Sequence, residues 1–300
     1  MSRSGPTSVE IAAPAKLNLG LEVLGRRDDG YHEIATIFLA IDLQDRLLVS
    51  PDDQLVLEST PDGLAGAENL ALQALEVLRE SSGVGAGASI ELTKRIPIAS
   101  GLGGASSDAA AALLAGREAW RLDVSDASLH RLAAKLGSDV PFFLHGGCAL
   151  GRGRGETLEA LPVPVDLWFV IAVPDIALPR KTATLYAALD ADDFSDGSRV
   201  LAQARRIAAG LPIDVGLLGN AFARPLYALA PHLADLPSVM RDAGAEAVAL
   251  SGAGPAHFAP FPAGDAAEAA AGRLRRALGA AARVFVARPL AERPAPSRPL

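Results

Sequence analysis

Hydrophobic positions in the first hundred residues form short runs that are separated by glycine, proline and aspartate. In the run "LNLGLEVLG" apolar and polar residues alternate, which is the pattern of a half-buried strand. Leucines at helical spacing in residues 68–79 predict a helix. The predicted strands of this part are residues 9–25, 32–50, 55–60 and 88–98.

Helical patterns dominate after residue 120, with apolar runs of strand type between them. Residues 125–136 predict an amphipathic helix with Ser125 as its N-cap and Gly137 at its end. The other predicted helices are residues 198–211, 231–244 and 265–281, and the other predicted strands are residues 167–173, 245–252, 257–261 and 282–290. Helices and strands mixed in this way indicate an α+β fold.

A proline-flanked segment, "LPVPVD", divides the chain into two lobes near residue 165. A length of 300 residues suits two domains of ordinary size. We expect an N-terminal domain of residues 1–165 and a C-terminal domain of residues 166–290. Residues 291–300 are rich in proline and are expected to be disordered.

The composition is that of a globular protein, because half of the residues are hydrophobic and 21% are charged. A net charge of −7 argues against a nucleic-acid-binding protein. We find no secretory signal and no uncharged apolar run of about 18–20 residues, so we expect a cytoplasmic protein without membrane contact. The single cysteine, Cys148, lies among apolar residues and is expected to be a buried, inert thiol. Only four residues are lysines: Lys16, Lys94, Lys135 and Lys181.

The segment "PIASGLGGASSDAAAALLAG", residues 97–116, combines a glycine-rich stretch with an alanine-rich helix. Glycines leave the backbone N–H groups accessible, and a helix N-terminus attracts anions, so the pattern favours a phosphate-binding loop. The alternative is a flexible turn in which a serine caps the helix. The segment is neither a Walker loop nor a dinucleotide-binding fingerprint, because it lacks a glycine-lysine pair and a downstream acidic residue in a βαβ unit.

Two charged residues lie in unusual surroundings. Lys16 alternates with leucines on a predicted strand, where a lysine commonly protects an edge strand or extends to solvent. Asp139 follows a predicted helix and precedes an apolar run, where an aspartate commonly forms a turn or caps a helix. A catalytic role stays open for both, with Asp139 as a general base.

A second glycine segment, "LSGAGPAHFA", has the pattern of a tight hairpin turn at Ser251, Gly252 and Gly254. Motifs of zinc peptidases, α/β-hydrolases and protein kinases are absent from the sequence. The five histidines are scattered along the chain, which argues against a zinc site.

Three segments in this order resemble the motifs of the GHMP kinase superfamily of small-molecule kinases: "PAKLNLGL", "PIASGLGGASSDAAAAL" and "LSGAGPAHFA". Two further segments, "RRDDGYHEIATIF" and "LGSDVPFFLHGGCALGRGRGE", resemble the branch that acts on a cytidine-diphosphate-linked methylerythritol. The resemblance runs from about residue 13 to residue 258.

The resemblance implies a two-lobed α+β GHMP kinase fold with the active site in the cleft between the lobes. It also implies transfer of the γ-phosphoryl group of ATP to the 2-hydroxyl of the methylerythritol, with Mg²⁺ as a cofactor. We expect a small molecule as the partner and a monomer or a homodimer as the assembly. The metal ligands stay unassigned.

The resemblance also assigns residues. Lys16 and Asp139 fall on the catalytic pair, in which the lysine would keep the aspartate ionised and the aspartate would accept the hydroxyl proton. The ATP-binding positions are Pro97, Ile98, Ala99, Ser100, Gly101, Leu102, Gly103, Gly104, Ala105, Ser106 and Ser107. The substrate-binding positions are Asn18, Tyr31, His32, Thr182 and Tyr186, with His32 at the cytosine edge and the two tyrosines as stacking rings.

Asp108 stands where some members of the superfamily carry asparagine, and we expect it to cap the helix or to assist the metal. Two alternatives stay open for the whole chain. It could phosphorylate homoserine, mevalonate or a sugar, although "DDGYHEIATIF" argues against this. It could also be a catalytically silent nucleotide-binding paralogue, although the presence of both Lys16 and Asp139 argues against this.

Overall fold

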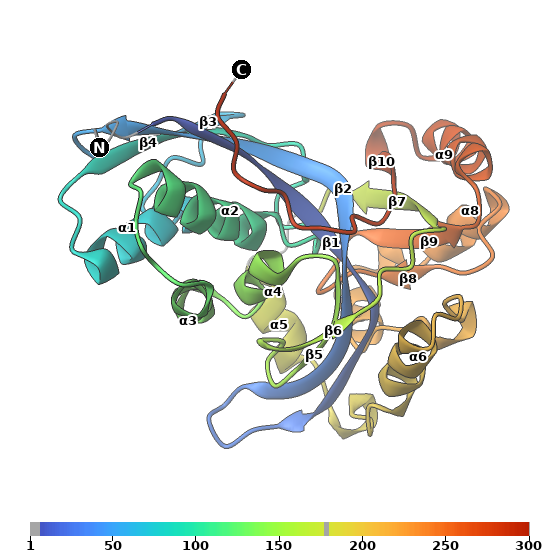
Figure 1. Ribbon diagram of the computed structural model, residues 1–300. Coiled ribbons are helices and arrows are strands. Elements are labelled where there is room, and N and C mark those ends of the chain that lie inside the picture. Colours follow the sequence, from blue (N-terminus) through green and yellow to red (C-terminus); the bar gives the residue numbers. More distant parts are fainter. Residues whose placement is uncertain (1–6, 177–179, 300) are drawn as a thin grey trace.

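The computed structural model describes residues 7–176 and 180–299 (Figure 1). Two β-sheets form its framework. The first sheet has six strands in the order β3-β4-β2-β5-β6, and β1 pairs with β2 off this path. Its strands are β1 (Val9–Arg26), β2 (His32–Asp52), β3 (Leu55–Thr60), β4 (Gly87–Thr93), β5 (Cys148–Arg152) and β6 (Thr157–Leu161). The second sheet, in the order β10-β7-β9-β8, contains β7 (Trp168–Pro174), β8 (Ala249–Leu250), β9 (His257–Phe261) and β10 (Ala282–Ala287).

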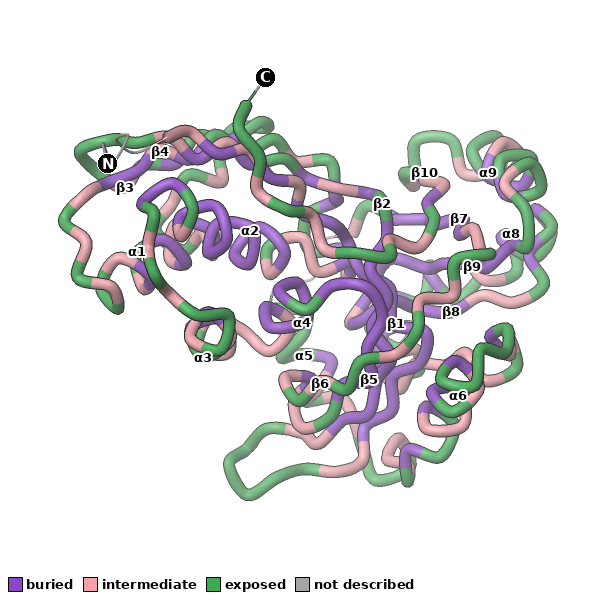
Figure 2. Tube along the Cα trace, viewed as in Figure 1, coloured by how far each residue is buried: buried purple, intermediate pink, exposed green. Residues whose placement is uncertain are grey.

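The helices between β3 and β5 lie together on one side of the first sheet (Figure 1). They are α1 (Leu70–Ser82), α2 (Gly104–Ala119), α3 (Asp126–Leu136) and α4 (Val140–His145). Helix α2 is buried along most of its length (Figure 2). Its alanines and glycines permit close packing, since a Cβ atom at Gly116 would lie 2.4 Å from Cδ2 of Leu75 on α1. The helix predicted from the alanine run is confirmed, and its small side chains allow its buried position.

The second half of the chain is mainly helical. Its helices are α5 (Lys181–Ala187), α6 (Ser198–Ala208), α7 (Ala223–Leu229), α8 (Leu236–Asp242) and α9 (Gly264–Leu278). Short 3₁₀ turns occupy Ala191–Asp193, Val215–Leu217, Pro231–Leu233 and Gly279–Ala281. Helices α8 and α9 pack with the second sheet, whereas α6 packs on β1 and β2. The predicted mixture of helices and strands is confirmed.

Three element predictions need correction. The strand expected over residues 88–98 is β4, which ends at Thr93. The helix expected over residues 231–244 is divided into a 3₁₀ turn and α8, because Pro237 lacks an N–H donor and fits only in the first turn of a new helix. The strand expected over residues 245–252 is only β8, two residues long. By contrast, the predicted cap is present, since the Ser125 side chain accepts a hydrogen bond from the Ser128 backbone at 3.2 Å.

The chain passes from the first sheet to the second between β6 and β7, where we expected the lobe boundary. The lobes still share apolar contacts. One buried cluster contains Leu17 and Leu19 of β1 together with Phe169 of β7 and Phe258 of β9. The strands β1 and β2 are buried over most of their length, consistent with their place between the helices of both halves (Figure 2).

The expected disorder of the proline-rich end is wrong for residues 291–299. Glu10 and Ser297 exchange two backbone hydrogen bonds of 2.8 Å, and Nη1 of Arg293 donates to the Leu144 carbonyl at 2.7 Å. Strand β1 pairs with β2 on one side only, so its outer edge offers backbone groups to the last residues. Residue 300 lies outside the described residues.

Candidate active site

Lys16 lies on β1, where it is 3% exposed. The strand alternation turns Lys16 and Asn18 away from the apolar cluster that contains Leu17 and Leu19. Nζ of Lys16 donates to Oδ1 of Asn18 at 2.5 Å, and Nδ2 of Asn18 donates to Oγ1 of Thr36 at 2.8 Å. The interpretation of Lys16 as a solvent-facing edge lysine is therefore wrong, because its ammonium group is held inside the molecule.

Asp139 lies at the start of α4, directly after the turn that ends α3. Its side chain makes no cap hydrogen bond to α4, so the interpretation as a capping aspartate is wrong. The carboxylate instead faces Lys16, with 3.8 Å between Oδ2 and Nζ. Burial lowers the pKa of Lys16, and the charge of Asp139 opposes this effect. The structure thus brings together the two residues that the sequence separates by more than a hundred positions.

The glycine loop, residues 97–107, connects β4 to α2. Gly101 and Gly103 have φ angles of 87° and 76°, which a side chain would strain. A Cβ atom on Gly103 would also lie 2.7 Å from Cζ of Phe143 and 3.1 Å from Cγ of Lys16. Among the described residues no side chain forms an N-cap hydrogen bond to α2. The first backbone N–H groups of α2 are therefore available to a ligand. The loop therefore has the accessible backbone that phosphate binding requires, and its phosphate-binding role stays a prediction.

The glycine turn, residues 251–255, joins β8 to β9 as the predicted hairpin. It also packs directly on the glycine loop. Oγ of Ser251 donates to the Gly101 carbonyl at 3.1 Å, and the Ala256 backbone donates to the Ser100 carbonyl at 2.9 Å. The turn therefore supports the loop from the second lobe.

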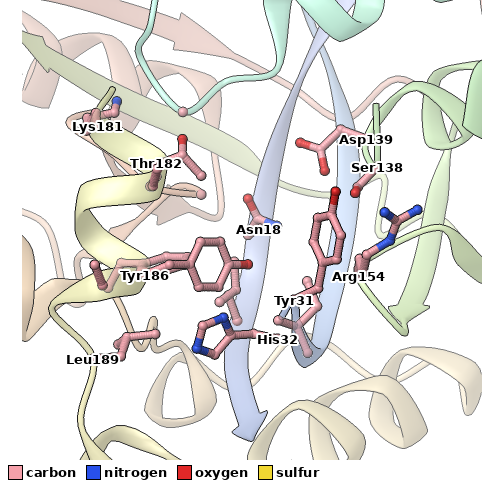
Figure 3. A pocket seen from close by; sticks show the side chains of 18 of the residues that line it. Asn18, Tyr31, His32, Ser138, Asp139, Arg154, Lys181, Thr182, Tyr186 and Leu189 are labelled. Atoms are coloured by element: carbon pink, nitrogen blue, oxygen red, sulfur yellow. The ribbon is translucent and has the colours of Figure 1, made fainter. Parts of the chain in front are cut away.

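Both segments border a cleft of about 1360 Å³ (Figure 3). We call the side with Lys16, Asp139 and the glycine loop its lysine end. The side with Tyr31, His32 and Tyr186 is its aromatic end. The predicted site residues that line the cleft are Lys16, Asn18, Tyr31, His32, Ala99, Gly101, Gly103, Ser106, Asp139, Thr182 and Tyr186.

The aromatic end is formed by rings from both halves of the chain. His32 stacks on Tyr186 of α5, with 4.7 Å between the ring centroids. Burial and the charge of Arg26 lower the pKa of His32, whereas burial and the charge of Asp139 raise the pKa of Tyr186 to about 12. Tyr31 is 54% exposed, and Cζ of the Arg154 guanidinium group lies 4.6 Å from the centroid of its ring. These rings present flat surfaces to the cleft (Figure 3).

A second cavity of about 310 Å³ lies beside the cleft and shares the glycine loop with it. The predicted residues that line only this cavity are Pro97, Ile98, Ser100, Gly104 and Ala105. Leu102 and Ser107 are buried and line neither cavity. Leu102 packs in the core, and its carbonyl oxygen accepts a hydrogen bond from the Lys16 backbone at 2.9 Å. The hydroxyl oxygen of Ser107 is buried and has no hydrogen-bond partner among the described residues.

Asp108 is buried beside the second cavity and forms an ion pair with Lys94 at 2.6 Å. Lys94 also pairs with Asp45, which accepts backbone hydrogen bonds from Arg95 and Ile96. Burial raises the pKa of Asp108 to about 7 against the attraction of Lys94. Burial alone would lower the pKa of Lys94, but the two carboxylates raise it. The expectation that Asp108 caps α2 is wrong, because its carboxylate is committed to this triad.

Sequence reasoning missed three contributors to the site: Arg154, Lys181 and the Lys94–Asp45 pair. Arg154 belongs to "GRGRGE", where glycines around arginines were a usable signal. Lys181 and Lys94 are two of only four lysines, and that scarcity was the signal for them. No local pattern links Lys94 to Asp45, since 49 positions separate them.

The cleft is cationic in an acidic protein. The charged residues that line it are Lys16, Arg26, Arg154, Arg180 and Lys181 on the basic side and Asp139 and Asp190 on the acidic side. Such a cleft favours anionic ligands. Within residues 7–176 and 180–299, no cluster of three His, Cys, Asp or Glu side chains is placed to hold a metal, and no helix is long and apolar enough to cross a bilayer.

Comparisons with known proteins agree with this geometry. Residues 69–147 match the GHMP kinases N terminal domain, and residues 204–280 match the GHMP kinases C terminal domain. The 4-diphosphocytidyl-2-C-methyl-D-erythritol kinase of Symbiobacterium thermophilum is 42% identical over 85% of this chain and 91% of its own length. The chain belongs to the 4-diphosphocytidyl-2-C-methyl-D-erythritol kinase family.

Other relatives support the same assignment. The 4-diphosphocytidyl-2-C-methyl-D-erythritol kinase of Dehalococcoides mccartyi is 41% identical over 83% of this chain and 87% of its own length. A crystal structure of 4-(cytidine 5'-diphospho)-2C-methyl-D-erythritol kinase has a TM-score of 0.79 at 39% identity and covers 93% of this chain and 98% of its own. A homoserine kinase from Cytophaga hutchinsonii, at 21% identity and a TM-score of 0.76, shares the fold. The two-lobed GHMP kinase fold is confirmed, and the chain is an ATP-dependent small-molecule kinase.

Proposed function

We propose that this kinase transfers the γ-phosphoryl group of ATP to the 2-hydroxyl of 4-diphosphocytidyl-2-C-methyl-D-erythritol, giving the 2-phosphate and ADP. One observation carries the proposal: the Lys16–Asp139 pair and the rings of Tyr31, His32 and Tyr186 line a single cleft. A substrate with a hydroxyl at one end and a flat base at the other fits such a cleft. The names of the relatives support the same substrate.

The lysine end supplies the chemistry. Asp139 accepts the proton of the substrate hydroxyl as its oxygen attacks the γ-phosphorus atom. The ammonium group of Lys16, 3.8 Å from the carboxylate, stabilises the ionised Asp139 and the negative charge that develops on the attacking oxygen. Because phosphoryl transfer depends mainly on positioning and charge neutralisation, the glycine loop and the first N–H groups of α2 hold the phosphates in place.

The two cavities divide the ligands between them. The smaller cavity, lined by Leu64, Leu70 and Ile98, suits the adenosine part of ATP because its lining is largely apolar. The larger cleft receives the cytidine substrate, with His32 hydrogen-bonded to the cytosine edge and the tyrosine rings stacked on the base. The glycine loop borders both cavities, and the triphosphate would therefore pass from one to the other.

The residues present fit a Mg²⁺ ion that arrives with the nucleotide. Magnesium in kinase sites is held by one or two carboxylates and the substrate phosphates, and it needs no cluster of three protein carboxylates. The hydroxyl of Ser106 lines the cleft and would hold the ion together with the phosphates. The negative charge of Asp139 in the same cleft would attract the ion, while its carboxylate stays available to accept the hydroxyl proton. When bound, Mg²⁺ neutralises phosphate charge.

We also propose a cytoplasmic location, a monomeric or homodimeric assembly, and a domain boundary near residue 165. The boundary is supported by the passage from β6 to β7 at that point. The lone Cys148 is buried, and burial raises the pKa of its thiol to about 12, so it is suited to a structural role.

A coupled assay of ADP release with a panel of alcohols tests the proposed substrate. We expect turnover with 4-diphosphocytidyl-2-C-methyl-D-erythritol and at most trace turnover with homoserine, mevalonate or a sugar. Turnover with one of these three alcohols alone would overturn the substrate assignment and leave the kinase assignment intact. Absence of turnover with every alcohol, together with intact ATP binding, would favour the silent paralogue.

A further inference from the structure

Lys181 is a cation of the cleft that the reaction described above does not use. It is the first residue of α5, on the second lobe, and lies beyond Thr182 from the ring of Tyr186 (Figure 3). Its Nζ donates hydrogen bonds to the carbonyl oxygens of Ala99 in the glycine loop and of Gly254 in the glycine turn. The ammonium group therefore lies where the two glycine segments meet, at the lysine end of the cleft.

The charge on Lys181 has no acidic partner among the residues that the structure describes. Burial and the nearby charge of Lys16 lower its pKa to about 8. Both effects disfavour the ammonium form, and the two carbonyl contacts compensate only in part. An anionic ligand at this position would remove the penalty.

The contrast with the other lysines around the glycine loop strengthens this point. Lys16 faces Asp139, and Lys94 faces both Asp45 and Asp108. Their charges are thus largely balanced within the protein. Of the three lysines at the loop, Lys181 alone keeps a charge that no described carboxylate balances.

We propose that Lys181 is a second cationic residue of the phosphoryl-transfer site and binds the γ-phosphoryl group of ATP from the second lobe. The proposal rests on the proposed function and extends it. Two anions could attract Lys181, the γ-phosphoryl group of ATP or the diphosphate of the cytidine substrate. Its contacts favour the first, because both carbonyl partners belong to the glycine segments that border the phosphate path.

The role of Lys181 in the reaction is electrostatic. The bond between the γ-phosphorus and the β–γ bridging oxygen breaks, the bond to the substrate oxygen forms, and the hydroxyl proton moves to Asp139. Lys181 keeps its proton throughout and stabilises the negative charge on the transferred group and on the departing ADP. Because Lys181 belongs to the second lobe, the phosphoryl-transfer site would be complete only when the second lobe holds Lys181 against the glycine loop of the first lobe.

The test compares Lys181→Met with Lys181→Arg and with a matched control, Lys135→Met, which removes an exposed lysine of α3. Loss of one donor aimed at developing charge reduces kcat by about 10²–10³-fold. We expect Lys181→Met to lose kcat to this extent, with the KM for the cytidine substrate within about twofold of wild type. Lys181→Arg should restore at least about a tenth of the activity, and Lys135→Met should behave as wild type.

A binding measurement without any acceptor alcohol separates this proposal from the proposed function. Calorimetry should show that Lys181→Met raises the Kd of a non-hydrolysable ATP analogue by a factor at least about ten times larger than the factor by which it raises the Kd of ADP. An equal loss for both nucleotides would mean that Lys181 only ties the loop to the turn, and would overturn the proposal. A raised KM for the cytidine substrate with unchanged nucleotide binding would also overturn it, in favour of the substrate diphosphate.

Discussion

At its lysine end the cleft is lined by the buried side chains of Lys16 and Asn18, which contact each other, and by the partly exposed Asp139, whereas at its aromatic end the rings are partly open to solvent. Lys16 is 3% exposed and is held by Asn18 and Asp139, while Tyr31 is 54% exposed. The first arrangement fixes atoms before a ligand arrives. The second provides surfaces that a flat ligand can cover.

This difference indicates that the lysine end contributes mainly to catalysis and the aromatic end mainly to substrate binding. Preorganised charges lower the barrier of a reaction because they need not rearrange as charge develops. Rings such as Tyr31 and Tyr186 contribute binding energy that is similar for the ground state and the transition state, and such energy changes KM more than kcat. Variants at the two ends should therefore differ in which kinetic constant they alter.

The largest effect is expected for Asp139→Ala. Removal of the general base should lower kcat by about 10³-fold, while the affinity for ATP stays within about threefold of wild type. Steady-state kinetics and nucleotide titration measure the two quantities. Asp123→Ala, at an exposed carboxylate outside both cavities, is the control. Activity within tenfold of wild type would show that Asp139 is not the base.

The next effect is expected for Gly101→Ala in the glycine loop. A Cβ atom there would lie 2.2 Å from the Ser251 carbonyl oxygen, and the φ angle of 87° disfavours any side chain. The loop must move away from the glycine turn, so the Kd for ATP should rise by about 10²-fold. Gly85→Ala is the matched control, because a Cβ atom added there would meet nothing within 4 Å and its backbone needs no special conformation. Unchanged ATP binding in Gly101→Ala would argue that the loop does not hold the phosphates.

A smaller effect is expected for Tyr31→Ala at the aromatic end. Stacking of a base on an aromatic ring contributes about 1–3 kcal/mol, so the KM for the cytidine substrate should rise about tenfold with kcat within threefold. Tyr31→Phe keeps the ring and should stay close to wild type. A raised KM for ATP in Tyr31→Ala would instead place Tyr31 in the nucleotide site.

The sequence predicts local features of the fold well and long-range features poorly. The strand around Lys16, the Ser125 cap and the alanine helix depend on neighbours in the chain, and the structure contains all three. The expectation that this strand is half-buried is wrong, because residues 13–23 are buried on both faces of β1. The course of the last residues depends on contacts with β1 and β2 that no local pattern encodes. Proline content alone therefore led us to expect disorder at the end of the chain.

The same distinction holds in the site. Lys16 and Asp139 were identified through resemblance to a family, since neither spacing nor periodicity indicates that they meet. Lys181 reaches the glycine loop only because α5 and the second lobe pack against the first. The position of Lys181 depends on tertiary structure. The only signal for it in the sequence is that the chain contains just four lysines.

The smallest effect is expected for Asp108→Asn, which tests whether the buried carboxyl group of Asp108 beside Lys94 ionises in the folded protein. An unperturbed aspartate carboxyl has a pKa of 3.8, whereas the pKa of Asp108 in the folded protein is about 7. Between these two pH values the folded state therefore binds more protons than the unfolded state. The stability of the wild type should therefore fall as the pH rises from about 4 to 7. Asparagine cannot ionise, and the free energy of unfolding of the variant minus that of the wild type should increase over this window.

Because the charges of Lys94 and Asp45 act on Asp108 in opposite directions, we expect this increase to be about 1–2 kcal/mol. Urea unfolding at pH 5 and pH 8 measures it, with the exposed Asp53→Asn as the control. A difference that does not change with pH would mean that Asp108 stays ionised in the folded protein. Two ionised carboxylates, Asp45 and Asp108, would then share the single positive charge of Lys94 beside the second cavity.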